Sequence, residues 1–112
     1  MGHFLDGRVS LVVGTHTHIP TSDHRVLKGG TGFMADASMC GDFDSIIGTD
    51  TDEPLNRFLT GIPNGRFTPA EGEATLCGVA IETDPATGLA RHICPLRVGG
   101  VLSQVLPDFA ER

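Results

Sequence analysis

The sequence predicts a mixed α/β fold made mostly of strands, with one clear helix and a C-terminal hairpin. Three observations predict this fold. Residues 9–13 form an apolar run that is typical of a buried strand. Residues 50–62 carry apolar side chains at helical spacing, and two β-rich runs between residues 75 and 94 flank a turn. A chain of 112 residues suits a single domain.

Two histidines follow the first strand directly, in the segment Gly14-Thr15-His16-Thr17-His18. If the backbone stays extended here, His16 and His18 project to the same side, about 6.5–7 Å apart along the strand. Neutral imidazole is the commonest metal ligand, and two metals about 3.5–4 Å apart are a usual arrangement for phosphate ester hydrolysis. The pair lacks the four-ligand closure of a structural zinc site, so two surface histidines on a loop are the alternative.

A polar, proline-containing loop is expected at residues 19–25, before a short strand at 26–28 and a glycine-rich turn at 29–32. That turn is not a P-loop, because it lacks the GxxxxGK[ST] order. His24 and Arg25 in the preceding loop are either solvated or hold a phosphate oxygen beside a metal.

Asp36 ends a second short apolar strand, expected at residues 32–36. A carboxylate in this place either orients a metal-bound histidine or caps the loop at residues 38–44. The apolar segment 45–48 that follows is expected to pack against the core.

The helix expected at about residues 50–62 has acidic residues in its first turn, where the helix dipole favours negative charge. Thr49, Asp50 or Thr51 can cap it. Asn56 and Arg57 are expected to face solvent. The apolar stripe is expected to pack in the core and consists of Leu55, Phe58, Leu59 and Ile62.

Strands at about residues 75–83 and 89–94, joined by a turn at 84–88, form the expected hairpin. His92 alternates with apolar neighbours and is expected on the outer face rather than at a metal. Residues 98–112 contain two glycines and a proline and are expected to form a poorly ordered tail, which leaves residues 1–97 as the folded part.

Eight Lys and Arg against fourteen Asp and Glu give a net charge of −6, which argues against broad nucleic-acid binding. A small anionic substrate bound through metals stays compatible with that charge. Three cysteines without CxxC spacing favour free thiols in a reducing cytoplasm. Since neither a long apolar run nor a basic leader is present, a cytoplasmic protein without a membrane partner is expected.

The histidine motif and the segments around it resemble the YmdB-like branch of the calcineurin-like metallophosphoesterases. The resemblance runs from about Leu5 to Ile93. It is carried, in order, by residues 6–10, 14–18, 29–32, 36–41, 45–48, 57–63 and 87–90.

This resemblance implies the C-terminal half of an α/β/β/α sandwich, with residues 1–97 as a partial domain and residues 1–8 as the end of a helix. Members of the family are longer, and their first half supplies the general acid and the remaining ligands of a two-metal centre. Upstream of His16, this sequence offers only His3 and Asp6. The resemblance thus implies that the chain is truncated and contains no catalytic residue of its own.

By resemblance, His16 ligates one metal and His18 the other. The implied metals are iron or manganese, and the implied substrate is a small phosphodiester, particularly a 2′,3′-cyclic nucleotide. The alternative is a catalytically incomplete fragment whose histidines are empty or hold a partial site. Since a severed half exposes an apolar face, we expect a homo-oligomer, or a separately encoded N-terminal half as partner.

Overall fold

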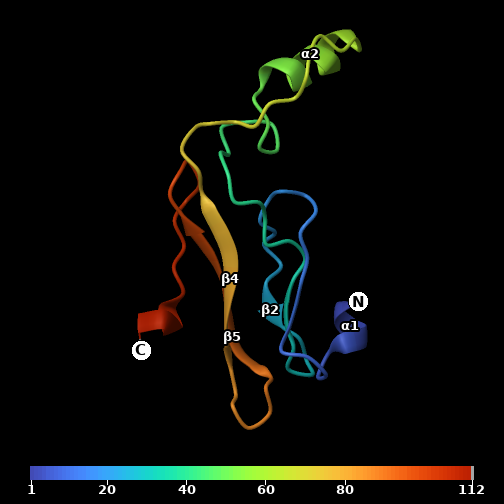
Figure 1. Cartoon of the computed structure of the whole chain (residues 1–112). Helices are drawn as coiled ribbons and strands as arrows, with labels where there is room; N and C mark the ends of the chain where they lie inside the picture. The colour runs from blue at the N-terminus through green and yellow to red at the C-terminus, as the bar shows by residue number, and fades with distance from the viewer. Residues whose placement is uncertain (112) are drawn as a thin grey trace.

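The computed structural model of the chain describes residues 1–111, and their main chain forms an elongated molecule of 56 × 32 × 17 Å. A small sheet and a long hairpin lie side by side, and a short helix stands apart from them at one end (Figure 1). The expected mixed α/β fold with mostly strands and few helices is confirmed.

The small sheet has three strands in the order β1-β3-β2. β1 (Leu11–Val13) pairs in parallel with β3 (Gly32–Met34), and β2 (Arg25–Val26) pairs with β3 in antiparallel fashion. These strands are shorter than the apolar runs that predict them. A four-residue helix, α1 (Gly2–Leu5), precedes the sheet.

The hairpin consists of β4 (Leu76–Thr83) and β5 (Ala90–Val98), close to the expected limits at its start and longer at its end. β5 lies beside β2 and β3. The Ala90 N–H donates to the Gly30 carbonyl at 2.8 Å, and the Ser10 hydroxyl donates to the Gly88 carbonyl. These bonds attach the turn of the hairpin to the small sheet. Val105 also pairs with Arg97, so part of the segment after β5 returns along that strand.

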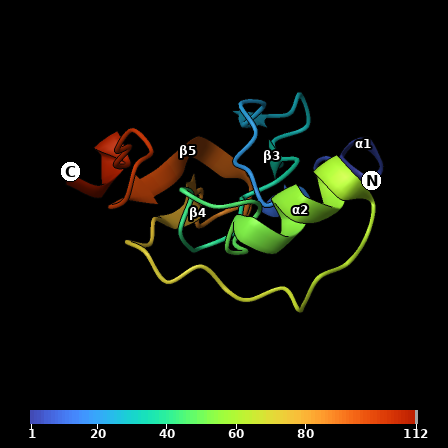
Figure 2. The same ribbon diagram turned by 90° about the horizontal axis from the view of Figure 1, so that it is seen from above.

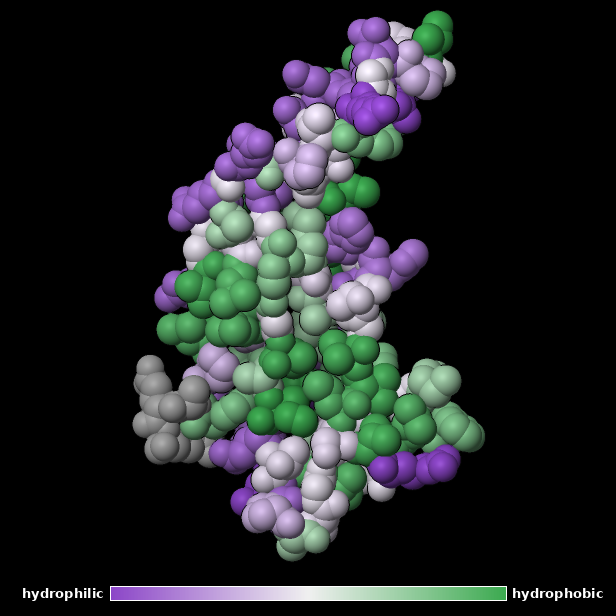
Figure 3. Space-filling view, viewed as in Figure 1, coloured by the Kyte–Doolittle hydropathy of each residue, from purple (hydrophilic) through white to green (hydrophobic). Residues whose placement is uncertain are grey.

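The core is small and lies where the two sheets meet. Met34 is fully buried, and Leu27 and Cys77 are nearly so. The buried Thr31 is hydrogen-bonded: its hydroxyl donates to the Val9 carbonyl at 2.7 Å and accepts the Gly7 N–H at 2.8 Å. On the face shown in Figure 3, apolar surface gathers around this junction, while polar residues are more frequent toward the end that carries the separate helix.

The separate helix is α2 (Asp52–Thr60), which confirms the helix expected at about 50–62. It ends at Gly61, whose φ of 71° is left-handed and whose N–H donates to the Arg57 carbonyl. The chain then returns to the hairpin as an extended connector (Figure 2).

The packing expected for α2 is wrong. Its apolar stripe faces solvent, with Phe58 87 % and Leu59 71 % exposed. The opposite face makes the contacts instead, because Arg57 bonds Glu53 at 2.8 Å and lies 4.2 Å from the centre of the Phe67 ring. Arg57, expected to be solvated, therefore fastens the connector to the helix.

The three cysteines are free thiols, and Cys77 is the buried one. Within residues 1–111, no helix combines the length and the apolar character needed to span a membrane.

Candidate metal-binding site

The histidine segment leaves the small sheet at the end of β1. The Gly14 N–H donates to the Met34 carbonyl, and the Ala37 N–H donates to the Gly14 carbonyl at 2.9 Å, so the exits of β1 and β3 stay together. Beyond Thr15 the backbone bends, and His18 has a left-handed φ of 68°. The extended conformation considered for residues 15–18 is therefore wrong.

The carboxylate of Asp36 causes this bend. It is 2 % exposed, and its Oδ2 accepts the N–H of His16 at 2.8 Å, the N–H of Thr17 and the Thr17 hydroxyl. Its Oδ1 accepts the Ser38 N–H at 2.7 Å. An extended segment would direct successive N–H groups to opposite sides. Here one carboxylate oxygen accepts two successive N–H groups, which requires the chain to bend.

These donors also change the acidity of Asp36. The Thr17 N–H, together with the other N–H and hydroxyl donors, holds the pKa of the Asp36 carboxyl well below its usual range, against the opposing effect of burial. The group is therefore a carboxylate at neutral pH. Its hydrogen bonds in the described structure go to the main chain of the histidine segment and to Thr17 and Ser38, not to an imidazole ring.

The bend brings both histidines to one hollow. An open hollow of about 210 Å³ is lined by His16 and His18 together with Thr15, Ser38 and Met39. Both histidines are exposed. The sequence expectation that these two rings can serve one site is thus compatible with the structure, although the backbone that presents them is bent rather than extended.

One imidazole has a defined hydrogen-bond partner. His18 Nδ1 lies 2.9 Å from the carbonyl oxygen of Ile47, and the Ser38 hydroxyl donates to the carbonyl of His18 at 3.0 Å. Neither Ile47 nor Ser38 stands out in the sequence as a site residue. Ile47 acts through its main chain, which no side-chain pattern reveals, and Ser38 is an ordinary loop residue.

The donor set suits part of a metal centre. A carbonyl oxygen can only accept a hydrogen bond, so Nδ1–H of His18 is the donor to Ile47, which leaves Nε2 of the neutral ring with a free lone pair. Metal-ligating histidines in proteins are generally held in this way. However, no three His, Cys, Asp or Glu side chains of residues 1–111 converge on a common metal position. The two histidines fit as ligands, and a complete centre requires further ones.

His24 and Arg25 do not join this hollow. The Arg25 guanidinium donates to the Asp23 carbonyl at 2.8 Å and lies 5.0 Å from the centre of the Phe33 ring. Arg25 lines a separate apolar groove beside β1 and β3. His24 is half-buried, and its Nδ1 has no hydrogen-bond partner within the described part of the chain.

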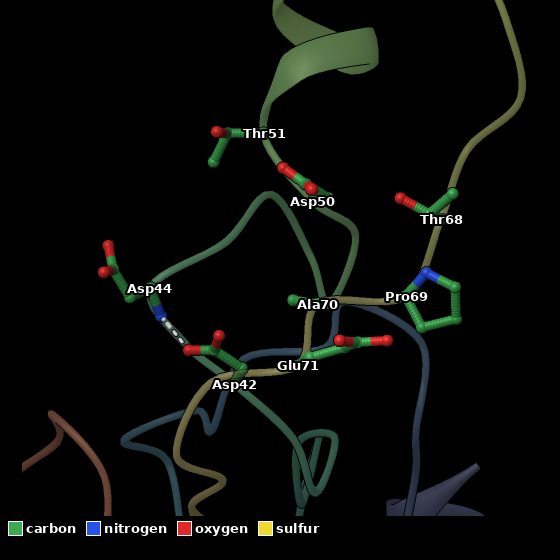
Figure 4. A pocket seen from close by; sticks show the side chains of 8 residues that line it. All are labelled: Asp42, Asp44, Asp50, Thr51, Thr68, Pro69, Ala70 and Glu71. Carbon is green, nitrogen blue, oxygen red and sulfur yellow. Dashed lines mark hydrogen bonds between the residues drawn. The ribbon is translucent and has the colours of Figure 1, made fainter.

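A larger hollow of about 600 Å³ lies beside the N-terminal end of α2 (Figure 4). Four acidic side chains line it: Asp42, Asp44, Asp50 and Glu71. Asp42 already accepts the N–H groups of Asp44 and Gly72. The negative charge of this hollow disfavours an anionic substrate, so the histidine hollow is the better candidate site for a phosphate ester.

Comparison with known proteins places these observations in a family. The family model for YmdB-like proteins matches residues 1–96. The chain is 48 % identical over 93 residues to a 2′,3′-cyclic-nucleotide 2′-phosphodiesterase of Bacillus subtilis, and the match covers 83 % of this chain and 35 % of that protein. The chain spans about a third of the length of the curated relatives it matches.

Two solved structures are similar. A hypothetical protein from Thermus thermophilus superposes with a TM-score of 0.80 at 39 % identity, covering 89 % of this chain and 38 % of that chain. A novel phosphatase from Mycoplasma pneumoniae superposes with a TM-score of 0.78 at 28 % identity, covering 99 % of this chain and 38 % of that chain. Both structures thus share the fold of most of this chain, and one of them is named as a phosphatase.

Proposed function

The chain belongs to the YmdB-like protein family, and from this premise we propose that it carries two metal ligands, His16 and His18, of a phosphodiesterase centre. The proposed substrate class is a small phosphodiester, in particular a 2′,3′-cyclic nucleotide. The relative named for this activity supports the substrate class. The observation that carries the proposal is the hollow that both histidines line.

In this proposal, His16 and His18 present ring nitrogens to a two-metal centre of iron or manganese. Such metals, when bound, activate a water as the nucleophile and stabilise charge on the phosphoryl oxygens. Asp36 keeps the main chain of the histidine segment in place through the N–H groups of His16 and Thr17. No residue of this chain is assigned as the general acid.

The remaining ligands must come from elsewhere, because two imidazoles leave most of a metal's coordination unfilled. We propose that another polypeptide segment supplies them, and the length of the relatives supports this source. The three free thiols are compatible with a reducing cytoplasm, which we propose as the location.

The second candidate function is a catalytically incomplete oligomer whose histidines hold no metal or only part of a centre. The exposed apolar stripe of α2 favours self-association, and the lack of a third ligand among residues 1–111 favours an incomplete site. Two copies that placed their histidines together would form a four-histidine site.

An activity assay separates the two candidates. Hydrolysis of 2′,3′-cyclic AMP is measured with Mn²⁺ or Fe²⁺, first for the chain alone and then mixed with the segment of the Bacillus subtilis relative that the match does not cover. We expect little or no activity alone and metal-dependent activity in the mixture, which His16→Ala and His18→Ala each abolish. An associated mixture that stays inactive would favour the incomplete oligomer.

A further inference from the structure

Three residues other than glycine have a positive φ among residues 1–111: His18 at 68°, Ser38 at 88° and Ile47 at 50°. Hydrogen bonds connect all three, because the Ser38 hydroxyl donates to the His18 carbonyl and His18 Nδ1 contacts the Ile47 carbonyl. Such conformations persist only where the surrounding structure imposes them, and they concentrate at functional sites. Here they meet at one of the two candidate ligands.

Ile47 lies in a tight turn. Ile46 and Thr49 exchange both main-chain hydrogen bonds, at 3.0 and 2.9 Å, so Ile47 and Gly48 are the two central residues. Both have positive φ, at 50° and 92°. This is the pattern of a type I′ turn, in which Asn-Gly is the preferred central pair. A β-branched residue at positive φ is an outlier, so local turn chemistry does not account for Ile47.

Side-chain packing does not account for Ile47 either, because its side chain is 57 % exposed. The turn itself is well held. The Ser45 hydroxyl accepts the Gly48 N–H at 2.9 Å, and the Ala70 N–H donates to the Gly48 carbonyl at 2.9 Å. The consequence of this turn for the site is the direction of the Ile47 carbonyl, whose oxygen lies 2.9 Å from His18 Nδ1.

We propose that the main-chain carbonyl of Ile47 is a positioning group for His18: it fixes the Nδ1–H tautomer and so leaves Nε2 as the nitrogen that meets a metal. A carbonyl oxygen only accepts, so the proton of the neutral ring must lie on Nδ1. The inference rests on the proposed function only in assuming that a metal binds at Nε2. The tautomer is a property of the metal-free chain.

The first test measures the tautomer directly. Long-range ¹H–¹⁵N correlation spectra of the imidazoles are recorded on the metal-free wild-type chain at a pH at which the rings are neutral, with His18→Gln to assign the signal. We expect a pyrrole-type Nδ1 and a pyridine-type Nε2 for His18. An Nε2–H tautomer, or an averaged signal, would overturn the inference, and this test does not require any variant of the Ile47 turn to fold.

The second test changes the turn and measures Zn²⁺ affinity by calorimetry. Ile47→Pro forbids positive φ and so displaces the carbonyl, while the matched control Ile47→Asn retains the turn. We expect Ile47→Pro to bind Zn²⁺ about 10- to 100-fold more weakly and Ile47→Asn to bind as the wild type does. Ser45→Ala, which loosens the same turn from outside the site, is expected to weaken binding in the same direction.

Two outcomes separate failure of the inference from failure of the proposed function. Equal Zn²⁺ affinity for Ile47→Pro and Ile47→Asn, with a wild type that binds through His16 and His18, would overturn the role of Ile47 alone. A wild type with the Nδ1–H tautomer but no metal binding would overturn the proposed function, and with it the purpose assigned to Ile47.

Discussion

Among single residues, Asp36 has the largest effect on the shape of the site. Its buried carboxylate accepts main-chain N–H groups of His16, Thr17 and Ser38 and the hydroxyl of Thr17. It therefore supports the proposed metal ligands through the backbone, whereas the sequence led us to consider support of an imidazole ring. The sequence also allowed Asp36 to cap the loop at residues 38–44. The hydrogen bond that Asp36 accepts from the Ser38 N–H agrees with that role.

Replacing this carboxylate should loosen the histidine segment. In Asp36→Asn the amide offers only one acceptor oxygen, so main-chain N–H groups lose their partner and a lower Tm is expected, with weaker binding of divalent metal. The exposed Asp108→Asn is the matched control and should leave both quantities unchanged. Thermal unfolding followed by circular dichroism measures the Tm. An unchanged Tm in Asp36→Asn would contradict the role of Asp36.

The low pKa of Asp36 also predicts a pH dependence. A depressed folded-state pKa means that the stabilisation is complete above the unfolded-state value of about 3.9 and is lost as the pH falls through the folded-state value. Wild-type stability should therefore fall with acidification below about pH 4 more steeply than that of Asp36→Asn. Urea unfolding at a series of acidic pH values measures how the free energy of unfolding of each protein changes with pH. Equal changes in the wild type and in Asp36→Asn would contradict the lowered pKa of Asp36.

Among the elements, α2 differs most from its expected packing. Its apolar residues share one face, as the spacing predicts, but that face is exposed. Phe58→Ala should therefore change the free energy of unfolding by no more than about 0.5 kcal/mol. Met34→Ala, at a fully buried position of β3, should cost about 2–5 kcal/mol. Urea titrations at low protein concentration provide both values, and a large loss for Phe58→Ala would mean that another surface covers α2.

The element types could be predicted because each depends on local patterns. Alternation and turn residues mark the hairpin at 75–94, and the 3.6-residue period with Gly61 after it marks the helix. Whether a face is covered depends on neighbours that are distant in sequence. The period of Leu55, Phe58 and Leu59 therefore identified a face without identifying what lies against it.

The site could be predicted only in part, for a similar reason. The spacing of His16 and His18 indicated a shared site, and one hollow receives both side chains. The left-handed φ of His18 and the contact with the Ile47 carbonyl could not be predicted. Both depend on main-chain groups of other loops, which carry no side-chain signal.

The whole molecule exposes much apolar surface for its size. The α2 stripe faces solvent, and an apolar groove of about 470 Å³ beside β1 and β3 is open. Surfaces of this kind favour association. We therefore propose that the chain forms homo-oligomers when no other segment covers these faces.

Sedimentation velocity tests this association. The wild type should sediment as a species heavier than one chain at micromolar concentration, and Phe58→Glu with Leu59→Glu should shift it toward the monomer. Arg66→Glu is the matched control, because it adds the same charge change at an exposed position of the connector, outside the stripe. A wild-type monomer would contradict the proposed oligomer, and an unchanged mass in the double variant would exclude α2 as the interface.

Metal content per chain tests the proposal that His16 and His18 are metal ligands. Purified chain is equilibrated with Mn²⁺ or Fe²⁺ and analysed by elemental analysis, as wild type, as His16→Ala with His18→Ala, and as the control His92→Ala on the exposed face of β5. We predict bound metal in the wild type and in His92→Ala, at less than the two metals per chain of a complete centre because further ligands are missing, and none in the double variant. A wild type without metal, or a double variant that retains it, would contradict the claim.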